Sequence, residues 1–131
     1  EELMPEVESS LGLKQPKRYI AGVSLSGLFA LWASCRCPLF EAVGSVSGSL
    51  WYDGFTDWLC AQHPMSDKYY FSLGIKEKDG KNTRLASVEQ HTLKAISVLE
   101  DAGATVFFEY NEGNHFGPLL ERMEKAMLYI L

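Results

Sequence analysis

A short stretch near the start of the chain has the residue types of a nucleophilic centre. Residues 22–27 read G-V-S-L-S-G and lie between two apolar runs, the first of strand length and the second of helix length. A serine in a tight turn from a strand into a helix presents its hydroxyl at the sheet edge, where the helix dipole favours developing negative charge. The residues two before and two after it come close together, and Gly22 and Ser26 are both small. The pattern predicts Ser24 as a nucleophile, with Ser26 where the usual G-x-S-x-G motif has glycine.

The same serine also has a purely structural interpretation. Serine is common at helix N-caps, where it contributes about 1 kcal/mol, and a G-x-S-x-small pattern occurs often by chance. The order of the residues that follow favours a catalytic centre instead. Hydrolases of this type carry their acid after a later strand and their histidine after the last one, in the order Ser, Asp/Glu, His.

A histidine occupies the expected place after the last predicted strand. His115 lies in the loop 111–116, which reads N-E-G-N-H-F, and Gly113 and Gly117 flank the histidine. Such a loop is free to lean over the sheet edge towards Ser24. His63 and His91 have no comparable position, and we expect them on the surface or on a helix face. The sequence therefore predicts His115 as the general base.

The loop after the third predicted strand supplies the candidate acid. Residues 74–79 read G-I-K-E-K-D and contain Glu77 and Asp79. Glu77 is favoured because it lies three residues past the glycine that ends the strand, whereas Asp79, beside another glycine, resembles a turn residue. Asp53 and Asp57, after the second strand, are less favoured acids.

These three residues suit acyl transfer. We expect His115 to take the proton of Ser24 as the serine oxygen attacks an acyl carbon, while Glu77 fixes the imidazole tautomer and stabilises the imidazolium. The backbone N–H of Leu25 would bind the oxyanion, and losing one such donor typically costs roughly 10²–10³ in rate. A second donor normally comes from a loop after an earlier strand, which this sequence lacks.

The elements that must bring these side chains together alternate along the chain. Apolar runs predict strands at 19–23, 42–47, 69–73 and 105–110, and helical patterns occur at 1–11, 25–35, 53–60, 82–102 and from 118 onward. Continuous apolar strands separated by helices imply a parallel sheet covered on both faces. The sequence therefore predicts a single α/β domain over residues 1–131.

Two of the predicted helices have clear apolar faces. One is a long helix that begins near Asn82 or Thr83 and ends at Gly103, and the other is opened by Gly117 and Pro118. Their apolar positions are Leu85, Val88, Thr92, Ile96 and Leu99 in the first and Leu119, Met123, Met127 and Ile130 in the second.

Composition argues against several other classes of protein. The 131 residues are 47% hydrophobic and carry a formal net charge of −5, so the chain lacks the basic footprint of nucleic-acid binding. No apolar stretch approaches the length that spans a bilayer. Cys35, Cys37 and Cys60 lack metal-site spacing and are expected to be buried or half-buried free thiols in a reducing compartment. We expect a cytoplasmic protein with neither a metal nor another cofactor.

Four segments together resemble the esterase-D-like or "putative esterase" branch of the α/β-hydrolases. The resemblance covers nearly the whole chain in the right order, through residues 20–33 (I-A-G-V-S-L-S-G-L-F-A-L-W-A), 45–51 (S-V-S-G-S-L-W), 70–77 (Y-F-S-L-G-I-K-E) and 108–116 (F-E-Y-N-E-G-N-H-F). It implies a serine hydrolase that cleaves carboxylic esters of small molecules. By resemblance, Ser24, Glu77 and His115 match the family's catalytic triad, and Trp51 would line the acyl or alcohol pocket.

The resemblance also implies that this chain is the C-terminal half of an α/β-hydrolase fold, with about four parallel strands flanked by helices. The first strand would then be central in the complete sheet, and its outer edge would be exposed, which is an aggregation hazard. We expect an upstream segment of the same protein, or a second chain, to cover that edge. Two alternatives stay open: a hydrolase-like module that binds a ligand or partner without turnover, and a flavodoxin-like binding domain.

Overall fold

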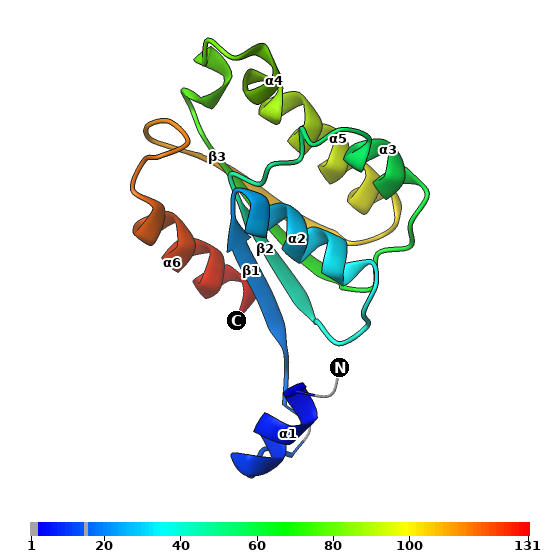
Figure 1. The fold of residues 1–131 in the computed structure, drawn as a ribbon. Coiled ribbons are helices and arrows are strands. Elements are labelled where there is room, and N and C mark those ends of the chain that lie inside the picture. The colour runs from blue at the N-terminus through cyan, green and yellow to red at the C-terminus, as the bar shows by residue number, and fades with distance from the viewer. Residues whose placement is uncertain (1–2, 15) are drawn as a thin grey trace.

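Four parallel strands form one sheet in the order β1-β2-β3-β4, which is also their order along the chain (Figure 1). The computed structural model describes residues 3–14 and 16–131. The strands are β1 (Tyr19–Val23), β2 (Ala42–Val46), β3 (Lys68–Gly74) and β4 (Thr105–Asn111). The predicted α/β class and parallel strands are confirmed, with small shifts at strand ends.

Helices cover both faces of this sheet. Figure 1 shows α2, α3 and α5 on one side and α6 on the other, while α1 extends away from the sheet. The helices are α1 (Leu3–Ser10), α2 (Leu25–Ser34), α3 (Phe55–Cys60), the 3₁₀ turn η1 (Glu77–Asp79), α4 (Thr83–Ala86), α5 (Val88–Asp101) and α6 (Leu119–Ile130). The first two residues of the predicted helix 1–11 lie outside the described residues.

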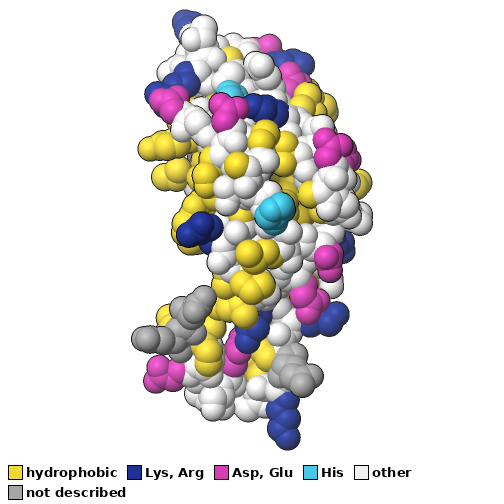
Figure 2. Space-filling view, turned by 90° about the vertical axis from the view of Figure 1, so that its right-hand side faces the viewer, with side chains coloured by type: hydrophobic (Ala, Val, Ile, Leu, Met, Phe, Trp, Pro, Cys, Tyr) yellow, Lys and Arg dark blue, Asp and Glu magenta, His cyan; other side chains and the backbone are white. Residues whose placement is uncertain are grey.

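The surface carries charges of both signs. Figure 2 shows Lys and Arg side chains interspersed with Asp and Glu on the visible face, with hydrophobic side chains between them. Within residues 3–14 and 16–131, every helix is too short or too polar to cross a bilayer.

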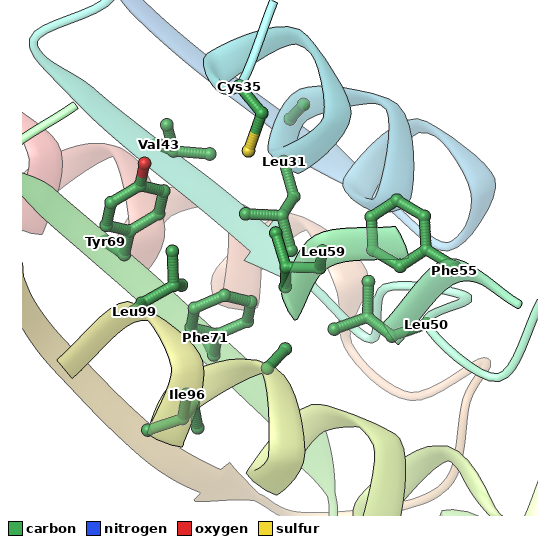
Figure 3. Close-up of a cluster of buried hydrophobic side chains, with 12 residues drawn as sticks. Leu31, Cys35, Val43, Leu50, Phe55, Leu59, Tyr69, Phe71, Ile96 and Leu99 are labelled. Carbon is green, nitrogen blue, oxygen red and sulfur yellow. The ribbon is translucent and has the colours of Figure 1, made fainter. Parts of the chain in front are cut away.

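The larger core lies between the sheet and the layer of α2, α3 and α5 (Figure 3). Alternate residues of a strand point to opposite faces, so Val43 of β2 and Tyr69 and Phe71 of β3 all point into this layer. The helices contribute Leu31, Leu59 and Leu99, each with no exposed surface. A smaller core on the other face packs Ala126 and Ile130 of α6 against the intervening strand residues.

The predicted long helix is wrong in one respect, because the structure divides it into α4 and α5 at Ser87. The Ser87 hydroxyl donates to the carbonyl of Arg84 at 2.7 Å, a local bond that competes with helix continuation. Leu85, in the separate α4, is 46% exposed, whereas Val88 and Leu99 of α5 are buried as predicted. Asn82 caps α4 through its side-chain oxygen.

Three other expectations also need correction. Met127 is 49% exposed, because the buried stripe of α6 runs through Arg122, Ala126 and Ile130 at four-residue spacing. Cys60 is exposed and therefore not the buried thiol that was expected. Helix α6 begins at Leu119, so Pro118 is its N-cap and not its first residue.

The edge of β1 that faces away from β2 has no partner strand in the part of the chain that the structure describes. The two helices that contact β1 expose large apolar side chains. These are Leu25, Phe29 and Trp32 on α2, and Leu120, Met127 and Leu128 on α6, followed by Leu131. An unpaired strand edge beside exposed hydrophobic side chains favours association with further polypeptide.

Replacing Gly22 with alanine will destabilise the turn between β1 and α2. A Cβ atom at Gly22 would lie 2.3 Å from the backbone oxygen of Ser26, which cannot move without opening the turn. We expect Gly22→Ala to lower the free energy of unfolding by about 2 kcal/mol in a urea titration. Gly80→Ala is the matched control, because its Cβ would make only an ordinary contact of 3.5 Å. Equal stability of the two variants would contradict this account.

Candidate active site

Ser24 lies in a strained turn between β1 and α2. Its φ of 56° and ψ of −121° fall in a region that non-glycine residues rarely adopt, and such strain often marks functional sites. The turn is held by the Ser24 N–H, which donates to Val46 O at 3.0 Å. It is also held by Ser26, whose hydroxyl donates to Val23 O at 2.7 Å and accepts the Val23 N–H at 2.9 Å. Serine at position 26 therefore closes the turn through its side chain.

The structure brings Ser24, His115 and Glu77 together although they are far apart in sequence. The Ser24 Oγ lies 3.0 Å from His115 Nε2, and His115 Nδ1 lies 3.0 Å from Glu77 Oε2. A carboxylate accepts only, so the Nδ1 nitrogen carries the proton and Nε2 is left to accept from Ser24. This is the order of contacts that a serine nucleophile and its base require.

The loop that carries His115 packs directly on the end of β3. The N–H of Lys76 donates to Gly113 O at 3.0 Å. A Cβ atom at Gly74 would lie 2.7 Å from that same oxygen, so only glycine allows the loop to come this close. Gly113 itself has a φ of 91°, which glycine adopts without strain. These glycines place His115 over the sheet edge.

Glu77 is a buried carboxylate with several donors. It is 8% exposed, and its Oε1 accepts the Gly74 N–H at 2.6 Å and the Ser47 hydroxyl at 2.5 Å. Burial raises the pKa of Glu77, but the hydrogen bonds from Ser47, Gly74 and His115 outweigh it and hold that pKa below its usual value. Glu77 is therefore ionised at neutral pH and can stabilise a protonated imidazole.

The other candidate acids lie away from this centre. Asp79 is exposed at the end of η1. Asp53 pairs with Arg84 at 2.7 Å and Asp57 with Lys94 at 2.5 Å, in both cases on the surface. Only Glu77 contacts His115 among the acids that the sequence proposed.

Two side chains that contact Glu77 or its partners were not predicted from the sequence. Arg122 of α6 is 1% exposed, lies 3.3 Å from Glu77 Oε1 and donates to Ser47 Oγ. Ser47, whose φ is 47°, follows β2 and is fully buried. The one available signal was the four-residue spacing of Arg122 with Ala126 and Ile130, which puts the arginine on the apolar face of α6.

A cavity of about 210 Å³ opens beside Ser24. It is lined by Ser24, Ser49, Trp51, Glu77, Leu85, Val88, His115 and Phe116. Trp51 thus borders the same space as the Ser24 hydroxyl. Leu25 is the first residue of α2, so its N–H has no partner within the helix.

Over the described ranges, no three or more His, Cys, Asp or Glu side chains are grouped so that they could hold a metal ion.

The fold has the architecture of the α/β-hydrolases. The chain belongs to the family described as "Putative esterase", which it matches over residues 1–111. It is 29% identical over 98 residues to the uncharacterized protein YbbA of Bacillus subtilis (strain 168), a match that covers 71% of this chain and 38% of YbbA.

Solved esterase structures share this fold at low sequence identity. The siderophore hydrolase EstB from Aspergillus nidulans has a TM-score of 0.72 and 20% identity over 95% of this chain and 52% of its own. The enterobactin esterase FES from Shigella flexneri, solved with 2,3-di-hydroxy-N-benzoyl-serine, has a TM-score of 0.78 and 20% identity over 98% of this chain and 35% of its own. This chain thus spans about a third to a half of these proteins.

The low pKa of Glu77 predicts a pH-dependent contribution to stability. Because the pKa is lower in the folded state than in the unfolded chain, the ionised carboxylate stabilises the fold above the unfolded-state pKa. That contribution is lost as the pH falls through the folded-state pKa. We therefore expect the stability difference between wild type and Glu77→Gln to shrink in urea titrations from about pH 7 to about pH 3.

Glu124→Gln makes the same chemical change at an exposed position of α6. Its stability difference from wild type should stay small over the same pH range. A Glu77→Gln difference that does not change with pH would contradict an ionised, stabilising Glu77.

Proposed function

We propose that this chain carries the catalytic residues of a serine hydrolase that cleaves carboxylic esters. The observation that carries the proposal is the continuous contact from Ser24 Oγ to His115 Nε2 and from His115 Nδ1 to Glu77, each at 3.0 Å. Membership of an esterase family supports ester hydrolysis in general. The strained turn at Ser24 and the low pKa of Glu77 support the roles of the individual residues.

The reaction proceeds in two acyl-transfer steps. Ser24 Oγ attacks the acyl carbon while its proton passes to His115 Nε2, and the buried negative charge of Glu77 stabilises the imidazolium. The tetrahedral intermediate collapses as His115 returns the proton to the leaving alcohol, which leaves an acyl-serine. Water then attacks the acyl-serine with the same proton transfers, so the products are a carboxylic acid and free Ser24.

A backbone N–H and an apolar cavity beside Ser24 would bind the oxyanion and the substrate. The backbone N–H of Leu25, at the start of α2, stabilises the oxyanion of each intermediate. Trp51, Leu85, Val88 and Phe116 give the adjoining cavity an apolar wall. A cavity of about 210 Å³ suits the apolar acyl or alcohol portion of a small ester.

Replacing Ser24 with alanine will abolish the reaction. We expect Ser24→Ala, in the protein at its full natural length, to lose labelling by a fluorophosphonate and to lower kcat on short-chain p-nitrophenyl esters by roughly 10⁴-fold or more. Mass spectrometry of the labelled protein should place the adduct on the peptide that contains Ser24.

Ser10→Ala is the control, since Ser10 is exposed on α1 and bonds only to Val7 O. It should keep wild-type labelling and turnover. An unlabelled wild-type protein that binds ester analogues without hydrolysing them would instead support the non-catalytic binding module.

We also propose that polypeptide of the same protein, outside these 131 residues, pairs with the outer edge of β1. The proposal is supported by the unpaired edge and by the exposed apolar side chains of α2 and α6 beside it. This chain spans 52% and 35% of the two related solved structures, so those proteins contain further residues that could supply additional strands.

Sedimentation of the isolated 131-residue chain tests this second proposal. We expect it to self-associate with rising concentration, because the strand edge and the apolar faces of α2 and α6 are uncovered. The full-length protein should stay monodisperse, with the β1 amides protected from hydrogen exchange. A stable monomer of the isolated chain would contradict the proposal, and the same dimer from both proteins would identify a second copy as the partner.

A further inference from the structure

We propose that Arg122 is a positioning residue that holds one oxygen of Glu77 so that the other faces His115, and that its charge opposes the attraction of Glu77 for the proton on His115. This inference rests on the proposed hydrolase function. It concerns a residue of α6 that lies one layer behind the nucleophile and does not line the cavity beside Ser24.

Arg122 connects the acid to the loop that carries the base. Its Nη2 lies 3.3 Å from Glu77 Oε1 and also donates to Ser47 Oγ, while its Nη1 lies 3.4 Å from Asn114 O. Asn114 immediately precedes His115. One buried guanidinium therefore contacts both the acid and the backbone next to the base, and a planar group with several donors is suited to that task.

The two oxygens of the Glu77 carboxylate have different partners. Among the described residues, Oε1 accepts from Gly74, Ser47 and Arg122, whereas Oε2 accepts from His115. A partial rotation of the carboxylate would lengthen the three contacts of Oε1. The arrangement on Oε1 thus keeps Oε2 directed at the imidazole.

The charge of Arg122 also acts on the proton that His115 carries. Glu77 attracts that proton, and the guanidinium on the opposite side of the carboxylate partly offsets this attraction. Both side chains of the Arg122–Glu77 pair are almost fully buried, at 1% and 4% exposure, so solvent screens them little. Arg122 therefore weakens the electrostatic attraction of Glu77 for that proton.

The other charged groups near Glu77 do not share this role. Lys78 is directed to Glu89 at 3.4 Å, and Asp79 is exposed. Lys125, one turn from Arg122 on α6, contacts Glu109 and Asn111 instead. Within the described part of the chain, Arg122 is the one lysine or arginine that forms an ion pair with Glu77.

The test compares Arg122→Met, Arg122→Lys and Lys125→Met in the full-length protein. Removing the charge in Arg122→Met should move the acid limb of the plot of kcat/KM against pH to higher pH by about one unit. The same variant should lower kcat by about 10–100-fold. Arg122→Lys keeps the charge but cannot span both contacts, so kcat should fall while the acid limb stays near its wild-type position. Lys125→Met deletes a cation from the same helix and should change neither.

An NMR titration of the His115 imidazole, without substrate, separates this inference from the proposed function. The midpoint of that titration should rise in Arg122→Met even if the protein hydrolyses no ester. Normal turnover with an unmoved midpoint would overturn the role of Arg122 alone. If Arg122→Met does not fold, Ser47→Ala serves in its place, because it removes another contact of Glu77 Oε1 and should lower kcat. Wild-type kcat in both Ser47→Ala and Arg122→Lys would overturn the inference.

Discussion

The buried carboxylate of Glu77 is the interaction on which the candidate site depends. It receives hydrogen bonds from Gly74 at the end of β3, Ser47 after β2, His115 after β4 and Arg122 of α6. The turn after β2, the loop after β4 and helix α6 therefore converge on one ionised group near the end of β3. A buried charge is costly unless it is paired and hydrogen-bonded, so the fold and the position of the imidazole are linked through this contact.

The parallel sheet explains why these segments can meet. All four strands end at the same edge, so the residues that follow them lie side by side. Local strain then directs the side chains, since Ser24 and Ser47 both adopt positive φ values just after their strands. The close contact of Gly22 with the backbone of Ser26 keeps the first of these turns tight. The apolar cores on both faces hold the strands in register and so stabilise the strained turns.

Much of this arrangement could be predicted from the sequence because it depends on local patterns and chain order. Apolar runs indicated the strands, and the place of Glu77 and His115 after later strands predicted that they would meet Ser24. Arg122 was not predicted, because an arginine in an amphipathic helix is normally assigned to the polar face even where its spacing matches the apolar stripe. Its burial depends on the charge of Glu77, which is distant in sequence. The break at Ser87 and the exposure of Met127 likewise depend on side-chain contacts and packing that helical periodicity does not contain.

The most direct measurement of the central claim is a crystal structure of the full-length protein after reaction with an aryl alkylphosphonate. The account predicts a bond between phosphorus and Ser24 Oγ, a phosphonyl oxygen within hydrogen-bond distance of the Leu25 N–H, and His115 still bonded to Glu77. Phosphorus bound to another side chain, or a Ser24 that stays unmodified while the imidazole points away from it, would contradict the account.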